Sequence, residues 1–167
     1  MASTDREADF TAYVRARQRA LARFAYLLTG DAHSAEDLLQ SSLAKAYRKW
    51  DHIRTVEAPD AYVRRIMVNE HTTWWRRQWR HREVSGSHLI EVTDPPVTPA
   101  QGRDADLWDH VRSLAPQQRA AVVLRYYEDL SEAQTAQILG VSVGTVKSHT
   151  SRAISALRHK MTMEASA

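Results

Sequence analysis

Apolar residues recur along this chain at the three-to-four-residue spacing of amphipathic helices, and no segment alternates as a half-buried strand would. Leu39, Leu43 and Ala46 form one such apolar stripe, and Ser34 just before it is a typical helix N-cap. Pro59 stands where a first-turn proline is tolerated. The pattern therefore predicts an all-α fold. We expect helices over residues 9–28, 35–50, 60–82, 104–114 and 116–127, followed by a pair of helices over 131–160.

The last two predicted helices are joined by a tight turn, and the sequence carries the end signals of both. Ser131 and Gln134 have the spacing of a capping box, in which each side chain accepts a hydrogen bond from the backbone of the other residue. Gly140 suits the left-handed residue that ends the first helix, and Ser142 can cap the second. This spacing predicts a helix-turn-helix, a motif more specific than amphipathicity alone.

The second helix of this motif has two distinct faces. One face is expected to pack inward and carries Val146, Thr150, Ala153 and Leu157. The other face carries small, hydrogen-bonding or cationic residues, namely Gly144, Lys147, Ser148, Ser151 and Arg152. Such a face suits the floor of a DNA major groove. An ordinary helical hairpin with a polar outer face stays as the alternative to this prediction of duplex DNA binding.

A cluster of arginines and tryptophans near the middle of the chain is a second candidate nucleic-acid surface. Residues 62–82 contain six arginines, three tryptophans and one acidic residue, and Trp75 and Trp79 share one helical face with Arg76 and Arg80 alongside. Guanidinium groups neutralise phosphates and indole faces accept unstacked bases, so the segment is typical of proteins that bind single strands. In the alternative interpretation the tryptophans belong to the core, and this alternative is strongest for Trp74.

The helical pattern stops between residues 84 and 103, which divides the chain in two. Pro95, Pro96 and Pro99 lie in this segment and indicate a linker with partly extended character. We therefore expect a helical domain over residues 9–83, a flexible linker over 84–103 and a second helical domain over 104–160.

Charge and composition narrow the classes of function. The net charge of +3 and the isoelectric point near 9.4 favour a polyanionic partner. The chain has no cysteine, which excludes disulfides and thiolate metal sites. Charged residues occupy the N-terminus where a signal peptide would need an apolar core, and no apolar run reaches the roughly 18 residues of a membrane span. We therefore expect a cytoplasmic protein without membrane insertion.

Three segments of the sequence stand in the order found in bacterial sigma factors. They are AEDLLQSSLAKAYRKWD, then APDAYVRRIMVNEHTTWWRR, and after the prolines LAPQQRAAVVLRYYEDLSEAQTAQILGVSVGTVKSHTSRAISALR. Over about residues 9–160 the chain resembles the small extracytoplasmic-function (group 4) class, which keeps a promoter-melting domain and a domain that reads the upstream element. The resemblance implies a sigma factor that binds core RNA polymerase, reads the −35 element as duplex and melts the −10 element.

The resemblance also implies roles for individual residues. Those expected to dock on the β′ clamp helices of core RNA polymerase are Asp37, Leu39 and Gln40, and the β flap is a second polymerase partner. Together with the arginine–tryptophan cluster, the resemblance implies a surface that binds the −10 element. This surface comprises Asn69, Trp75, Arg76, Arg77 and Arg80. The loop at 54–59 would receive a flipped base. The −35 element would contact Lys147, Ser148, Ser151 and Arg152.

Two residues depart from the usual pattern of this family. Ser41 stands where many relatives have an acid, at the edge of the docking helix, and Thr135 replaces a branched apolar residue in the first helix of the helix-turn-helix. The resemblance further allows control by a separate anti-sigma factor, and it implies neither a cofactor nor a metal.

Two other classes of function fit the sequence less well. A stand-alone helix-turn-helix regulator would bind duplex operators as a dimer, and it would carry a dimerisation element or a receiver domain that this sequence pattern does not show. An enzyme would need a reactive site, but His81 and His88 lack paired ligand spacing, and no phosphate loop or nucleophile motif accompanies them. We therefore expect no catalytic residues.

Overall fold

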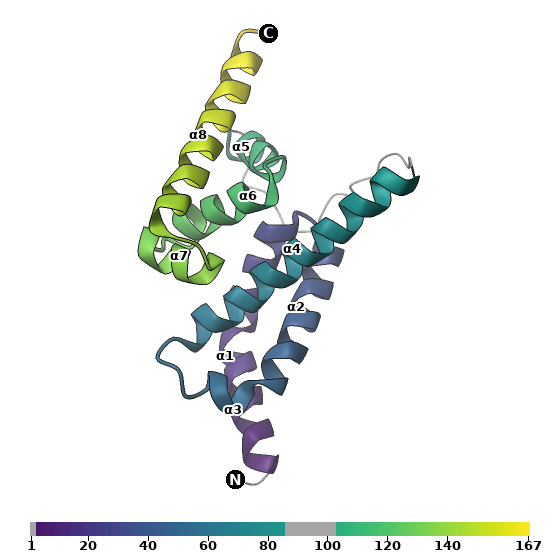
Figure 1. Cartoon of the computed structure of the whole chain (residues 1–167), viewed down its shortest axis with the longest axis vertical. Helices are drawn as coiled ribbons and strands as arrows, with labels where there is room; N and C mark the ends of the chain where they lie inside the picture. Colours follow the sequence, from purple (N-terminus) through teal and green to yellow (C-terminus); the bar gives the residue numbers. More distant parts are fainter. Residues whose placement is uncertain (1–2, 86–102) are drawn as a thin grey trace.

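The computed structural model describes residues 3–85 and 103–167, and every regular element in these ranges is a helix (Figure 1). In chain order the elements are α1 Ser3–Thr29, α2 Ala32–Arg48, α3 Trp50–Ile53, α4 Pro59–Ser85, α5 Arg103–Arg112, α6 Pro116–Val122, the π-helix η1 Val123–Tyr127, α7 Glu132–Leu139 and α8 Val143–Ala165. The predicted all-α fold is therefore confirmed. Most of the linker expected over 84–103 lies outside the described residues.

Helices α1 to α4 form one group, in which α1 packs along α2 and α4 crosses both (Figure 1). Gly30 ends α1 with a φ of 83°, a conformation that glycine adopts without a steric penalty. Asp31 follows at once and caps α2, because its carboxylate accepts a hydrogen bond from the backbone nitrogen of Ser34 at 2.8 Å. The prediction of a cap at Ser34 is therefore wrong, since the tight turn at Gly30 lets the cap come three residues earlier.

Helix α1 begins at Ser3 rather than at residue 9, where the apolar pattern placed its start. The additional turns are charged and are held by contacts with α2 and α3. Arg6 donates hydrogen bonds to the carbonyl oxygens of Tyr47 and Arg48 and pairs with Asp51 at 3.4 Å. These contacts satisfy carbonyl groups at the end of α2, which no pattern of apolar residues in α1 could reveal.

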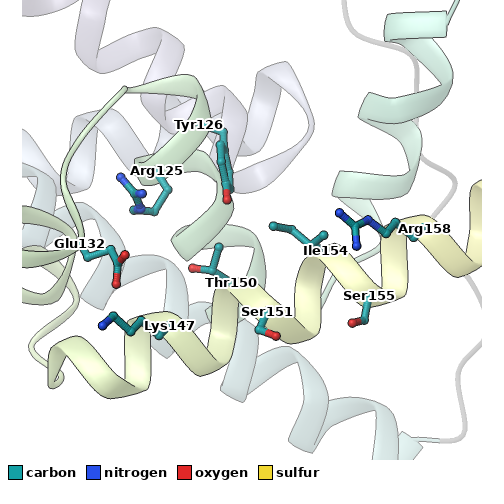
Figure 2. Close-up of a pocket in the computed structure, with 9 residues that line it drawn as sticks. All are labelled: Arg125, Tyr126, Glu132, Lys147, Thr150, Ser151, Ile154, Ser155 and Arg158. Carbon is teal, nitrogen blue, oxygen red and sulfur yellow. The ribbon is translucent and has the colours of Figure 1, made fainter.

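Helices α5 to α8 form the second group, and its middle contains the π-helix η1. The sequence predicted one continuous helix over 116–127, but the last turn widens, and the backbone nitrogen of Glu128 donates to the carbonyl oxygen of Val123 at 2.9 Å. Asp129 then takes a positive φ of 58° before α7 starts. Arg125 and Tyr126 of this widened turn line a groove together with residues of α8, and the ring of Tyr126 points toward α8 (Figure 2).

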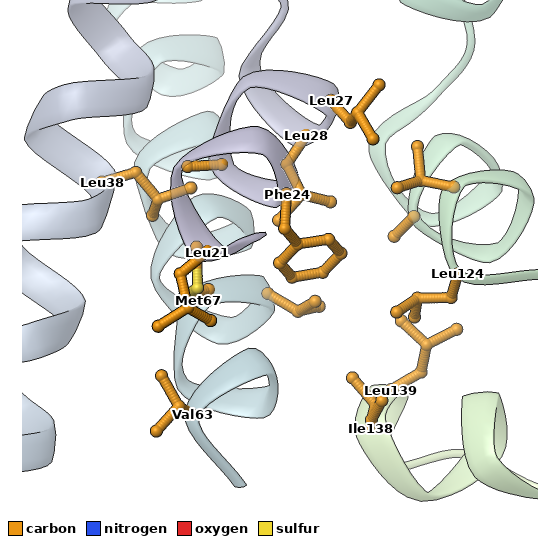
Figure 3. Packing of buried hydrophobic residues seen from close by; sticks show 14 of the residues in the cluster. Leu21, Phe24, Leu27, Leu28, Leu38, Val63, Met67, Leu124, Ile138 and Leu139 are labelled. Carbon is orange, nitrogen blue, oxygen red and sulfur yellow. The ribbon is translucent and has the colours of Figure 1, made fainter. Parts of the chain in front are cut away.

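Buried apolar side chains from both groups form one continuous cluster (Figure 3). Phe24 and Leu28 of α1 and Met67 of α4 lie in the same cluster as Leu124 of η1 and Ile138 of α7. A smaller cluster lies between α5, α6 and α8 and contains Val111, Leu114, Val122, Ala153 and Leu157. The two groups of helices are therefore in direct contact and share much of their core.

Candidate nucleic-acid interface

The helix-turn-helix forms with the end contacts that the sequence predicted. Ser131 and Gln134 form the complete capping box at the start of α7, with bonds of 2.9 and 3.1 Å. Gly140 ends α7 in the left-handed conformation with a φ of 68°. Ser142 caps α8 by accepting a hydrogen bond from the backbone nitrogen of Thr145 at 3.1 Å. Both helices of the motif are thereby fixed at the turn between them.

Helix α8 presents the two faces expected from its sequence. The predicted inward face is buried and comprises Val146, Thr150, Ala153 and Leu157. The predicted outer face is exposed and comprises Gly144, Lys147, Ser148, Ser151 and Arg152. Because small residues alternate with cations on this face, another molecule can approach the helix backbone closely between two positive charges.

A groove of about 370 Å³ runs along α8 beside the outer face (Figure 2). Lys147, Ser151 and Arg158 line it from α8, and Arg125 and Tyr126 line it from η1. Together with the single carboxylate of Glu132, the three cations give the groove a net positive charge. The sequence pattern does not indicate Arg125 and Tyr126, because it predicts ordinary helix there, in which their direction relative to α8 is not defined.

Helix α4 carries the second cationic surface. Asn69, Arg76, Arg77 and Arg80 are exposed, and Trp75 keeps 38% of its surface exposed. Trp74 is half-buried and packs against the main core cluster, which favours the core interpretation for this residue. The side chain of Trp79 lies outside the described residues. The loop at 54–59 joins α3 to α4 and therefore lies at the N-terminal end of this helix.

Glu70 is buried next to this surface and connects α4 to α2. It accepts hydrogen bonds from Ser41, at 2.6 Å, and from Lys45. Burial by itself raises the pKa of this carboxyl, but the bonds from Lys45 and Ser41 and the charges of Lys45 and Arg77 outweigh it, so the pKa of Glu70 lies below its ordinary value. An acid at position 41 would repel Glu70, which explains why serine suits this chain.

The helix expected to dock on polymerase exposes only part of its predicted contact set. Asp37 and Gln40 are exposed on α2, and Asp37 lies 3.5 Å from His33. Leu39, in contrast, is only 6% exposed and belongs to the main core cluster. Its inclusion in the docking surface is therefore corrected, because a leucine inside the core offers almost no area to a partner.

Comparison with known proteins assigns the family. The chain matches the family descriptions Sigma-70 region 2 over residues 13–81 and Sigma-70, region 4 over residues 105–157. It is 43% identical to the RNA polymerase sigma-E factor of Streptomyces coelicolor over 92% of this chain and 86% of the relative. The chain belongs to the extracytoplasmic-function class of RNA polymerase sigma factors. The ECF RNA polymerase sigma factor SigL of Mycobacterium tuberculosis is 34% identical, over 81% of this sigma factor and 79% of the relative.

Solved structures show the same fold. The sigma factor RpoE of Bartonella quintana, crystallised with the anti-sigma factor NepR, superposes with a TM-score of 0.78 at 30% identity, covering 92% of this sigma factor and 97% of that chain. CnrH, solved with the cytosolic domain of CnrY, has a TM-score of 0.62 at 21% identity over 94% of this chain and 90% of its own, a likeness of fold alone. Helices α1 to α4 thus contain the region 2 match, and α5 to α8 contain the region 4 match.

As a sigma factor, the chain acts with core RNA polymerase and promoter DNA in transcription initiation, as a regulatory DNA-binding protein. None of its described helices combines the length and apolar character needed to cross a membrane. The described residues also contain no cluster of three or more side chains suited to hold a metal ion.

Proposed function

We propose that this sigma factor reads the −35 element as duplex with α8, binds and melts the −10 element with α4, and docks on core polymerase through the exposed side of α2. One observation is the main support for this proposal. Two exposed cationic surfaces lie on different helices, one inside each region matched by the family. The proposed domain limits are residues 9–83 and 104–160, with a linker over 84–103, and both matched regions lie inside these limits.

The proposal for the −35 element rests on the outer face of α8. Lys147 and Arg152 can donate to guanine edges or to phosphates, and Ser148 and Ser151 can donate to or accept from either base-pair type. Their position in the first half of a capped helix matches the way recognition helices enter the major groove with their N-terminal residues. The positive groove beside α8 supports the same orientation, since a DNA backbone would follow it.

The proposal for the −10 element rests on the exposed side of α4. Arg76, Arg77 and Arg80 can neutralise the phosphates of an unpaired strand, and the partly exposed ring of Trp75 can accept a base by stacking. Stacking of one base on an aromatic ring contributes about 1–3 kcal/mol, which is enough to favour the open form of a few base pairs. Asn69 would supply hydrogen bonds to a base edge, and the loop at 54–59 would receive a flipped base.

The polymerase contact is proposed for Asp37 and Gln40, which α2 exposes beside the buried Leu39. The β′ clamp helices and the β flap are the proposed partner surfaces on core polymerase. A separate anti-sigma factor is a further proposed partner, because a relative that is 30% identical was crystallised with one.

Run-off transcription with core RNA polymerase on genomic fragments tests the proposal. The protein should direct defined start sites only when core polymerase is present. Replacing Lys147 and Arg152 with alanine should weaken use of an intact duplex promoter, by about 1–3 kcal/mol for each base that a side chain no longer binds, and should spare transcription from a pre-melted bubble. Replacing Arg76 and Arg77 together should slow promoter opening on duplex DNA, and a mismatched −10 region should relieve that defect.

The control variant is Arg15→Ala, which removes an exposed arginine of α1 outside both surfaces. It should leave transcription on both templates unchanged. Wild-type transcription by the Lys147/Arg152 variant on intact duplex would show that α8 does not read the upstream element. Tight, sequence-specific duplex binding by a dimer of the free protein, without polymerase-dependent start sites, would instead support the stand-alone regulator.

A further inference from the structure

Three polar or charged residues of α1 lie one helical turn apart, on the side of the helix that meets α3 and α4. They are Asp9, Tyr13 and Arg17, and their spacing of four residues places them on one face. The loop at 54–59 joins α3 to α4, and α1 contacts both of these helices (Figure 1). Contacts from this face of α1 can therefore fix where the loop begins and where it ends.

Asp9 holds the side on which the loop begins. Its carboxylate accepts a hydrogen bond from the indole nitrogen of Trp50, in α3, at 3.0 Å, and pairs with Arg54, the first residue of the loop, at 3.8 Å. The ring of Tyr13 packs on the same indole, with ring centres 4.9 Å apart. Because Trp50 is only 2% exposed, these contacts tie α1 to a firmly packed neighbour of the loop.

Tyr13 and Arg17 hold the side on which the loop ends. The hydroxyl of Tyr13 donates to one carboxylate oxygen of Asp60, in the first turn of α4, at 2.8 Å. Arg17 pairs with the other oxygen of Asp60 through its Nε at 3.1 Å. Burial, and then the hydrogen bond to Asp60, raise the pKa of Tyr13 above its ordinary value, so the hydroxyl keeps the proton that it donates. Both oxygens of this carboxylate are thus held, which ties the start of α4 to α1.

These contacts are too exposed to contribute much to stability. The side chains of Asp9 and Arg17 are 50% and 55% exposed, and ion pairs at such positions add little to the free energy of unfolding. The tip of the loop is exposed as well, at Thr55, Glu57 and Ala58. A loop that is fixed at both ends has fewer conformations than a free one, so a partner that binds its tip loses less conformational entropy.

We propose that Asp9, Tyr13 and Arg17 are positioning residues for the loop at 54–59, which they hold in the shape that captures one unpaired base of the −10 element. The three residues act through the loop and do not themselves bind the base. A binding site must be held to within roughly 0.5 Å to form its hydrogen bonds, and a loop needs support from its neighbours to reach this precision. The capture of a base rests on the function proposed above, whereas the anchoring of the loop does not.

Electron paramagnetic resonance of a nitroxide on the loop tests the anchoring in the full-length protein without DNA. The chain has no cysteine, so Glu57→Cys provides a single labelling site at the exposed tip. Tyr13→Phe with Arg17→Ala removes both contacts to Asp60 and should narrow the spectral lines of the label, because the loop gains motion. Lines as broad as those of the labelled protein without these two changes would overturn the proposal.

The matched control makes the same two changes elsewhere, as Tyr47→Phe with Arg15→Ala. In the part of the chain that the structure describes, neither the hydroxyl of Tyr47 nor the guanidinium of Arg15 has a hydrogen-bond or ion-pair partner. The control should therefore leave the spectrum of the label unchanged. Circular dichroism should show the wild-type helical content in both double variants, which separates a change in the loop from a loss of folding.

Run-off transcription with core RNA polymerase measures the consequence for base reading. Each position of the −10 element is changed in turn to the other three bases, on duplex templates and on templates with a pre-melted −10 region. At one position, Tyr13→Phe with Arg17→Ala should lower the base preference about three- to tenfold, the effect expected when one hydrogen bond to the base is lost. The defect should persist on the pre-melted template, because capture follows melting, and base preferences at the −35 element should not change.

The possible outcomes separate the anchoring of the loop from the capture of a base. A mobile label with unchanged base preference at every position would overturn the positioning role. So would a loss of preference that is spread evenly over all positions or that the control variant shares. If the wild type prefers no base at any position of the pre-melted template, capture of a base by the loop fails, and the label alone decides the anchoring.

Discussion

Thr135 and Thr150 are both buried in the helix-turn-helix, yet only one of their hydroxyl groups is hydrogen-bonded. The hydroxyl of Thr150 donates to the carbonyl oxygen of Val146 at 2.7 Å. Thr135 is 0% exposed, and its hydroxyl has no hydrogen-bond partner among the described residues. A buried polar group without a partner has lost its hydration with no compensation.

Thr135→Val keeps the shape of the side chain and removes the uncompensated hydroxyl, so it should raise the free energy of unfolding by about 1 kcal/mol. Urea denaturation followed by circular dichroism measures this change. Thr150→Val is the matched control and should fail to stabilise the protein, because it removes a hydroxyl that is hydrogen-bonded. A destabilised Thr135→Val variant would mean that this hydroxyl is satisfied in solution.

His71 of α4 is a half-buried base where the two groups of helices meet. Burial, and then the charge of Arg119, lower the pKa of His71 to about 4 from its ordinary value of 6.5. Arg112, Asp31 and Arg119 line the same pocket as this ring. Since the folded state binds the proton more weakly than the unfolded state, the stabilisation from neutral His71 is fully present above pH 6.5 and is lost as the pH falls toward 4.

We therefore expect the free energy of unfolding to fall between pH 6.5 and pH 4, by up to about 3 kcal/mol from this group. His71→Gln should remove that part of the pH dependence, and His159→Gln, an exposed histidine of α8, should not. Urea denaturation at several pH values gives both differences. Parallel pH profiles for wild type and His71→Gln would contradict the assignment.

The helix-turn-helix contains two glycines, and they differ in whether their backbone conformation requires glycine. Gly140 has a φ of 68°, a conformation that disfavours any side chain, and an added Cβ would also press on the movable end of Arg65 at 3.3 Å. Gly144 lies inside α8, and the nearest atom to an added Cβ is the Oγ of Ser142 at 3.8 Å. Glycine is therefore required for the fold at the first position only.

Gly140→Ala should lower the free energy of unfolding by about 1–2 kcal/mol, the usual cost of a left-handed residue with a Cβ. Gly144→Ala should leave stability unchanged or raise it by up to about 1 kcal/mol, because alanine favours helix. The same Gly144 variant should nevertheless weaken transcription from duplex promoters if this position approaches DNA. Thermal unfolding and run-off transcription of the two variants, side by side, distinguish a folding role from a binding role.

At the scale of the whole molecule, the shared core makes the two groups of helices depend on each other. Phe24 and Leu28 lie in the same buried cluster as Leu124 and Ile138, so unfolding of one group exposes apolar area of the other. The ion pair between Arg64 and Glu128 adds to this coupling.

Calorimetry of the full-length protein should therefore show one unfolding transition, with calorimetric and van't Hoff enthalpies that agree. Arg64→Glu should separate this transition into two, while Arg15→Glu should keep it single. Two resolved transitions in the wild-type protein would contradict the coupling between the groups.

Elements whose signals are local follow from the order of residues along the chain. Apolar periodicity gave the helices, and the capping box of Ser131 with Gln134, the left-handed Gly140 and the cap at Ser142 all form as predicted. The two faces of α8 also follow from the sequence, because in a helix the spacing of residues fixes which of them share a side. The order of three motifs indicated the family, which the matches to sigma-70 regions 2 and 4 establish.

Features that depend on residues distant in the chain follow from how the helices pack against one another. The early start of α1 requires Arg6 to reach the end of α2, and the burial of Leu39 and the half-burial of Trp74 depend on the helices that cover them. That Arg125 of the π-helix lines a groove together with α8 also depends on how these elements pack. The junction formed by Arg64, Arg65, Arg112 and Arg119 joins residues from both halves of the chain. Sequence spacing specifies neighbours along one helix, whereas packing between helices specifies which charges and rings meet across the fold.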